Sequence, residues 1–248
     1  MQLLFAFIIL STITLIAVLL IILNKNTRSG KVHEIANKNN WQYQEFIDLD
    51  ETMKAANFGL LNHSQNAIFR HIISTNTLNF ESNDKSLHKG FRFFDCRAIE
   101  PLGIHNSSVI LYYLDLQTEF SDLHACFTPI ESQQATIKNP VQSPIDKNYL
   151  IRLRQMQKLS LFPPHTSFDN YQLHTNKPHL LEQFLQQRIA NISIKTNLSS
   201  WLLAHPHLHI EISNGMLLAY QPNRLLDEES IIPAINAVAD ISKCLNEQ

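Results

Sequence analysis

The stretch HLHIEISNGMLLAY, residues 207–220, carries the clearest local structural signal in this chain of 248 residues. Asn214-Gly215 is a preferred pair for a two-residue type I′ turn, because both central positions of that turn need a positive φ angle. Alternating apolar residues lie before the pair, and an apolar run follows it. The stretch therefore predicts a β-hairpin with strands over residues 207–213 and 216–221.

The first strand of this hairpin raises the question of a metal site. His207, His209 and Glu211 alternate with apolar residues, so they share one face of the strand. Two histidines at this spacing can bind zinc, with Glu211 as a third ligand or a base. The predicted turn sets His209 opposite Tyr220 and Glu211 opposite Leu218, neither of which adds a typical zinc ligand. The favoured interpretation is a polar strand face that points to solvent, with no metal bound.

A second pair of candidate residues, His124 and Cys126, lies on the strand predicted over residues 123–130. A cysteine beside a histidine can act as a nucleophile with its base, or supply half of a zinc site. The nearest helper is expected to be Cys96, on a neighbouring predicted strand. Structural zinc sites usually contain a CxxC pair, which this sequence lacks, so core packing is the favoured interpretation. No catalytic, cofactor-binding or metal-binding residue is assigned, no cofactor is expected, and a non-catalytic role is favoured.

Composition excludes several classes of function. The formal net charge is −2, which gives no global field for attracting nucleic acid, and no nucleic-acid partner is expected. Only five glycines are present, and neither a G-x-G-x-x-G nor a G-x-S-x-G motif occurs.

The N-terminus predicts a membrane anchor. Residues 3–23 contain no charged residue, proline or glycine, and a helix of this length spans a hydrocarbon core of about 30 Å. Lys25, Arg28 and Lys31 follow the span, which predicts that the chain after it faces the cytosol. The expected localisation is the inner (cytoplasmic) membrane, with a single pass.

Further strands and helices can be placed by periodicity and by turn residues. Strands are predicted near residues 41–47, 67–74, 90–99, 108–116, 123–130, 149–156 and 170–175. Helices are predicted at residues 31–40, at 51–59 with Gly59 as the stop, from 177, near 198–204 and from Ser230. The consecutive strands between residues 67 and 130 suggest an antiparallel meander.

The predicted fold class is α+β, with an N-terminal transmembrane helix followed by a predominantly antiparallel sheet on which helices pack. The anchor and its basic flank take up residues 1–31, and a soluble α+β domain takes up residues 32–248. Two sub-lobes, if present, would meet near residues 131–167, where polar residues and prolines gather.

The order of these features resembles that of a broad group of uncharacterised bacterial proteins with an N-terminal transmembrane anchor and an α+β domain of unknown function. The resemblance is carried by residues 36–43, by 90–96 with its Phe94-Asp95 pair, by 123–130 and by 168–245. It implies the fold pattern and no particular activity.

The leading functional hypothesis is a membrane-anchored, non-catalytic interaction or scaffold domain that faces the cytosol. Its partners would be the membrane, through residues 3–23, and an unknown protein. One alternative is a membrane-bound hydrolase or metal-dependent enzyme that uses Cys126 and His124, or His207 and His209. Another is an envelope-facing component of a surface or secretion assembly.

Overall fold

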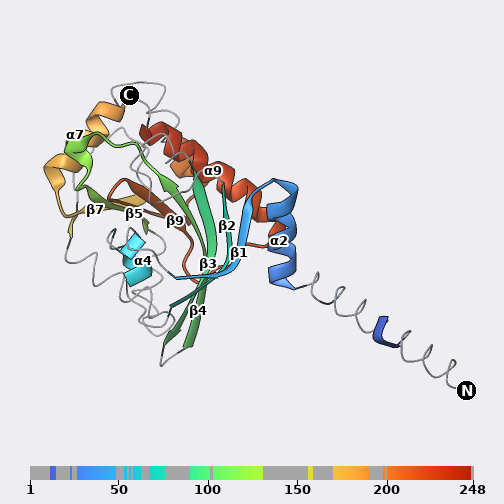
Figure 1. Cartoon of the computed structure of the whole chain (residues 1–248). Coiled ribbons are helices and arrows are strands. Elements are labelled where there is room, and N and C mark those ends of the chain that lie inside the picture. Colours follow the sequence, from blue (N-terminus) through green and yellow to red (C-terminus); the bar gives the residue numbers. More distant parts are fainter. Residues whose placement is uncertain are drawn as a thin grey trace, which may run out of the picture.

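The computed structural model describes residues 12–14, 23, 27–48, 53–54, 56, 58–62, 67–75, 90–100, 103–130, 156–158, 170–189, 198 and 200–246. Its strands form one nine-stranded sheet in the order β1-β2-β3-β4-β9-β8-β5-β7-β6, and each pair of neighbours is antiparallel (Figure 1). The strands are β1 (Gln42–Ile47), β2 (Ala67–Ser74), β3 (Phe91–Glu100), β4 (Gly103–Tyr113), β5 (His124–Pro129), β6 (Gln157–Lys158), β7 (Tyr171–Thr175), β8 (His209–Ser213) and β9 (Met216–Tyr220).

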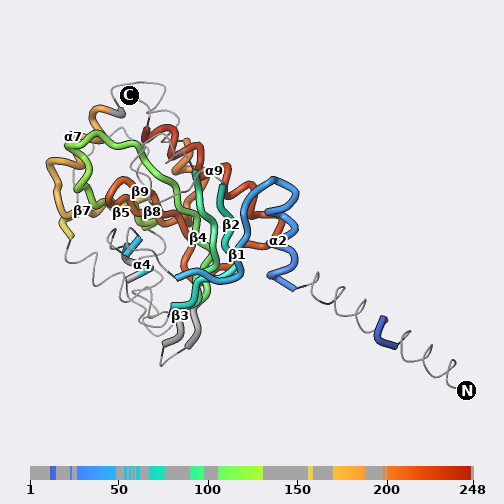
Figure 2. The backbone as a smooth tube through the Cα atoms, in the orientation of Figure 1, coloured from blue at the N-terminus to red at the C-terminus, as the bar shows by residue number. Residues whose placement is uncertain are grey.

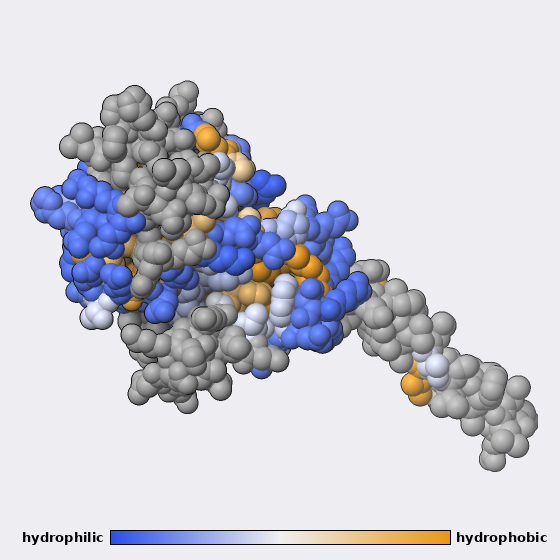
Figure 3. All heavy atoms as spheres, turned by 90° about the horizontal axis from the view of Figure 1, so that it is seen from above, coloured by the Kyte–Doolittle hydropathy of each residue, from blue (hydrophilic) through white to orange (hydrophobic). Residues whose placement is uncertain are grey.

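Helices lie on both faces of the sheet. They are α2 (Arg28–Lys38), α4 (Gly59–Asn62), the short 3-10 helix η2 (Thr118–Phe120), α7 (Pro178–Ile189) and α9 (Glu228–Asn246). The larger core joins α2, α7 and α9 to one face of the sheet. The smaller core joins α4 to the opposite face (Figure 1). Seen from above in Figure 3, the described surface is mainly hydrophilic, with hydrophobic residues gathered in a few patches.

The β8–β9 hairpin confirms the register that the Asn-Gly pair predicted. Asn214 and Gly215 have φ angles of 49° and 68°, as a type I′ turn requires. His209 pairs with Tyr220, and Glu211 pairs with Leu218. An added Cβ at Gly215 would also lie only 3.3 Å from a backbone oxygen, so glycine suits this position for two reasons.

The order of the strands departs from the predicted meander after β4. Strands β1 to β4 follow one another in space as they do in the sequence, but the β8–β9 hairpin lies between β4 and β5. Figure 2 shows the late red and orange segments of the chain beside the green ones in this part of the sheet. This insertion places β8 next to β5.

The fold class predicted from the sequence, α+β with a leading transmembrane helix, is corrected by the structure. The described chain is a large nine-stranded antiparallel sheet with few helices. Most of residues 3–23 lie outside the described residues, and no helix within the described ones is long and apolar enough to cross a membrane.

Four further predictions are corrected or lie outside the described residues. Gly59 was expected to end a helix, but α4 begins at this residue. The strand predicted at 149–156 lies outside the described residues except for Met156, and most of the expected sub-lobe boundary at 131–167 does so too.

The polar face of β8 was expected to point to solvent, but every residue of β8 and β9 is buried. Both strands lie in the middle of the sheet and are covered on both faces.

Candidate metal centre

Two strands that are distant in the sequence bring the candidate site together. In β5, the sequence HACFTP puts His124 and Cys126 on one face, while Ala125 and Phe127 enter the larger core from the other face. In β8, Glu211 is the Cα partner of Cys126 across the β5–β8 ladder. Residues directly opposite each other on antiparallel strands point to the same face and lie within side-chain reach. The register therefore brings Glu211 to the two residues of β5.

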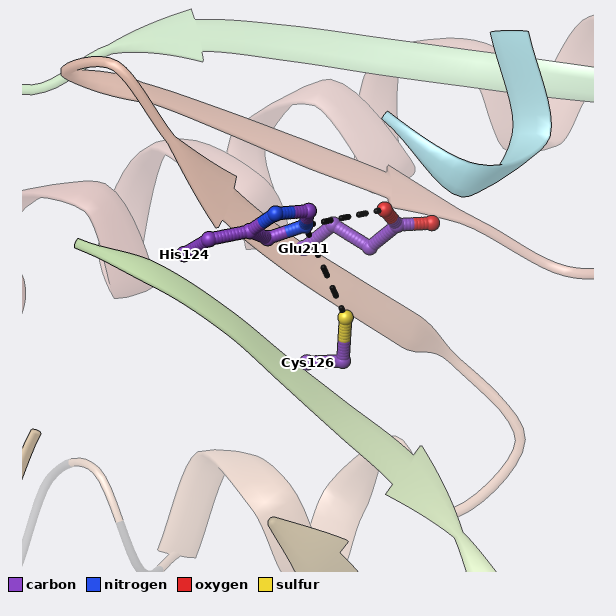
Figure 4. A group of neighbouring side chains, drawn as sticks. All are labelled: His124, Cys126 and Glu211. Atoms are coloured by element: carbon purple, nitrogen blue, oxygen red, sulfur yellow. Dashed lines mark hydrogen bonds and ion pairs between the residues drawn. The ribbon is translucent and has the colours of Figure 1, made fainter. Parts of the chain in front are cut away.

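The three side chains converge on a small volume, as Figure 4 shows. The Nε2 atom of His124 lies 4.0 Å from Cys126 Sγ and 3.9 Å from Glu211 Oε2. All three ligand atoms lie within 4.8 Å of one another. A tetrahedral ion with bonds of about 2.0–2.3 Å sets its donor atoms roughly 3.3–3.6 Å apart, so each atom would need to shift by about half an ångström. These side chains are thus nearly arranged to hold an ion.

A buried tyrosine orients the carboxylate of Glu211. Glu211 has no exposed surface, and Tyr220, on the next strand, is 1% exposed. The Tyr220 hydroxyl donates a hydrogen bond of 2.9 Å to Glu211 Oε1. This bond satisfies one carboxylate oxygen, and the other oxygen faces His124. A hydrogen bond from a neighbouring residue to a ligand side chain fixes the orientation of that ligand and supports metal affinity.

His207 and His209 do not join this centre. The ligand atoms that gather in the described part of the chain are those of His124, Cys126 and Glu211. His207 is exposed, whereas His209 is buried and stacks on the Tyr220 ring at 5.4 Å. Burial lowers the pKa of His209 to about 4, although the charge of Glu211 opposes this shift. The ring of Tyr220 stacks on His209, and its hydroxyl points to Glu211.

Cys96, the expected helper of Cys126, belongs to another part of the molecule. It lies on β3, and β4, β9 and β8 separate β3 from β5. Burial and the charge of Asp95 raise the pKa of the Cys96 thiol to about 12, so the thiol stays protonated at neutral pH. Cys96 packs in the smaller core.

The shared nitrogen of His124 distinguishes a metal site from a catalytic triad. In a triad, one imidazole nitrogen takes the proton of the nucleophile, while the other nitrogen is held by the carboxylate. Here Cys126 Sγ and Glu211 Oε2 both face the same atom, His124 Nε2. Three ligand atoms that gather around one point suit a bound ion instead.

A second polar cluster lies where α2 packs on β2 and β3. Arg28 donates two hydrogen bonds, of 3.0 and 3.1 Å, to the buried Asp95, and the Ser108 hydroxyl donates one of 2.6 Å. His71 Nδ1 lies 2.9 Å from the same carboxylate. His71 has a φ angle of 54° at a bulge in β2, where the pairing with β3 shifts. Arg28, which the sequence suggested only as a topology signal, thus links α2 to the sheet.

Comparisons with known proteins leave the site to be interpreted from its own geometry. The chain matches no family model, no curated protein and no solved structure at a level that indicates a relationship. The resemblance to anchored bacterial proteins stays a prediction.

Sequence reasoning identified His124, Cys126 and Glu211 but assigned them to two separate sites, and it missed the role of Tyr220 at the centre. One signal pointed the other way. The run MLLAY, residues 216–220, is apolar at consecutive positions, which is typical of a strand buried on both faces. Its hairpin partner β8 also pairs with β5 on its other side, and its polar residues are buried too.

Proposed function

We propose that this protein binds a transition-metal ion through His124, Cys126 and Glu211. The observation that carries the proposal is the convergence of three different donor atoms, from two adjacent strands, within 4.8 Å. Buried polar groups of this kind are costly unless they are paired or bind an ion.

The donor set indicates the class of ion. An imidazole nitrogen, a thiolate and a carboxylate oxygen are the ligands that zinc takes in proteins. Once Cys126 has lost its proton, a divalent ion balances the two negative charges of Cys126 and Glu211. With three protein ligands, such an ion has an open position at which it can act as a Lewis acid. The same ion would tie β5 to β8 and contribute to folding.

The proposal is tested by metal titration of the full-length, metal-free protein. Co(II) serves as the probe, because its absorption reports thiolate ligation, and Zn(II) affinity follows by competition. We expect one ion per chain in the wild type. Cys126→Ser should lose at least about tenfold in affinity, since even the loss of a residue that only orients a ligand costs about 10–100-fold.

A matched control uses a cysteine outside the cluster. Cys244→Ser changes a residue of α9 and should bind Co(II) as the wild type does. A wild-type protein that binds neither Co(II) nor Zn(II) would refute the proposal. The interaction or scaffold role stays a prediction that this experiment does not address.

A further inference from the structure

A methionine sulfur lies beside the proposed centre. Met156 precedes the edge strand β6, and its Sδ atom lies 3.9 Å from Cys126 Sγ. Strand β6 pairs with β7, which pairs with β5, so this sulfur reaches the centre from the side opposite β8. Cys126 Sγ therefore has a thioether sulfur at 3.9 Å and His124 Nε2 at 4.0 Å.

The two distances from Cys126 Sγ are close to those in a three-coordinate ion site. A trigonal ion with metal–sulfur bonds of about 2.3 Å and metal–nitrogen bonds of about 2.0 Å sets its donor atoms roughly 3.7–4.0 Å apart. The Cys126–Met156 distance of 3.9 Å matches the sulfur–sulfur spacing, and the Cys126–His124 distance of 4.0 Å exceeds the sulfur–nitrogen spacing by about 0.3 Å.

Thioether sulfur selects among metal ions. Methionine and cysteine are soft ligands that favour Cu(I), whereas zinc rarely takes a thioether. The charge balance also suits a monovalent ion. Cu(I) replaces the thiol proton of Cys126, which leaves to solvent, so the net charge of the buried centre does not change.

We propose that the centre binds Cu(I) through His124, Cys126 and Met156, and that Glu211 serves as a ligand only for divalent ions. This inference rests on the proposed function, because it uses the same His124 and Cys126. It adds Met156 as a ligand for Cu(I), and it limits Glu211 to divalent ions.

Two near-isosteric substitutions test the assignment. Cu(I) affinity is measured by anaerobic competition with a chromogenic Cu(I) chelator, and Co(II) affinity by absorption, both on the full-length protein. Met156→Leu should weaken Cu(I) binding by at least about tenfold, because loss of a residue that only orients a ligand already costs that much. It should leave Co(II) binding unchanged. Glu211→Gln should weaken Co(II) binding and leave Cu(I) binding unchanged.

Each remaining outcome overturns the inference in a distinguishable way. Unchanged Cu(I) affinity in Met156→Leu would mean that the thioether only packs against Cys126, and Co(II) binding would still support the proposed function. Loss of both ions in Met156→Leu would also overturn the assignment, because a ligand specific to Cu(I) spares Co(II). A wild type that binds no ion at all would overturn the proposed function and this inference together.

Discussion

His209 shows how a single buried side chain makes stability depend on pH. It is 3% exposed, stacks on Tyr220 and has a pKa lowered by burial to about 4, from 6.5. The His209 ring therefore stays neutral in the folded protein over a range of pH in which the same residue of the unfolded chain takes up a proton.

The direction of this effect follows from proton binding. Below pH 6.5 the unfolded state binds a proton that folded His209 does not, so stability falls as the pH is lowered to about 4. The loss is at most about 3 kcal/mol, at 1.36 kcal/mol for each unit of pKa shift. His209→Gln should remove this part of the pH dependence, as measured by denaturant unfolding between pH 7 and pH 4.

His207→Gln is the control for this prediction, because His207 lies two residues earlier and is exposed. It should keep the wild-type dependence of stability on pH. Equal slopes for wild type and His209→Gln would show that His209 does not titrate as its burial requires.

At the scale of elements, an ion pair, a small apolar contact and the hydrogen bonds of Ser29 to Tyr43 and Glu45 hold α2 to the sheet. Val32 and Ala36 of α2 are fully buried in the larger core. Arg28, at the first turn of α2, pairs with Asp95 on β3. Burial alone would raise the pKa of Asp95, but hydrogen bonds from His71, Arg28 and Ser108 hold it below its usual value.

Asp95→Asn should destabilise the protein by about 3 kcal/mol at neutral pH, because it leaves the partly buried Arg28 with only the more distant carboxylate of Glu228, at 3.8 Å. A carboxyl whose pKa is lowered by folding stabilises the fold at pH values above 3.8, its pKa in the unfolded chain. This stabilisation is lost as the pH falls toward the lower pKa of the folded state. The difference between wild type and variant should therefore shrink in acid below pH 3.8, as measured by denaturant unfolding at several pH values.

An exposed ion pair supplies the comparison for this variant. Asp122 lies 3.2 Å from Lys177, and both side chains are largely exposed. Asp122→Asn should cost about 1 kcal/mol or less. An equal cost for the two variants would contradict the role given to Asp95.

At the scale of the whole molecule, α2 is part of the folded unit. Removing residues 1–26 leaves Thr27, whose side chain accepts a hydrogen bond from Gly30 N and caps α2. This truncated chain should keep a cooperative thermal transition. Removing residues 1–38 exposes the apolar surface under α2 and leaves Asp95 without Arg28, at a cost of several kcal/mol.

Because a typical domain has only about 5–15 kcal/mol of stability, the longer deletion should unfold or lose its cooperative transition. Calorimetry of the two truncated proteins measures this difference. A stable protein without residues 1–38 would show that α2 is dispensable. Loss of folding after the shorter deletion would show that residues before Thr27 also stabilise the sheet.

The sequence by itself determined the local features of this protein. The Asn214-Gly215 turn predicted the β8–β9 register, because turn geometry and the two-residue period of a strand act within a few residues. The pattern AIFRHIIS predicted β2 with its observed ends. The helix predicted from Ser230 is α9, which begins two residues earlier, at Glu228, and buries Ile231, Ile235, Val238 and Leu245.

Only the tertiary structure decided which of these elements became neighbours. The insertion of β8–β9 between β4 and β5 set Glu211 beside Cys126, buried a polar strand face and moved Cys96 away from the centre. The pairing of Arg28 with Asp95 likewise joins segments that are distant in the sequence, and the bulge at His71 arises where β2 pairs with β3. Strand order depends on how whole faces pack into the two cores, and the periodicity of a single strand carries no information about its neighbours.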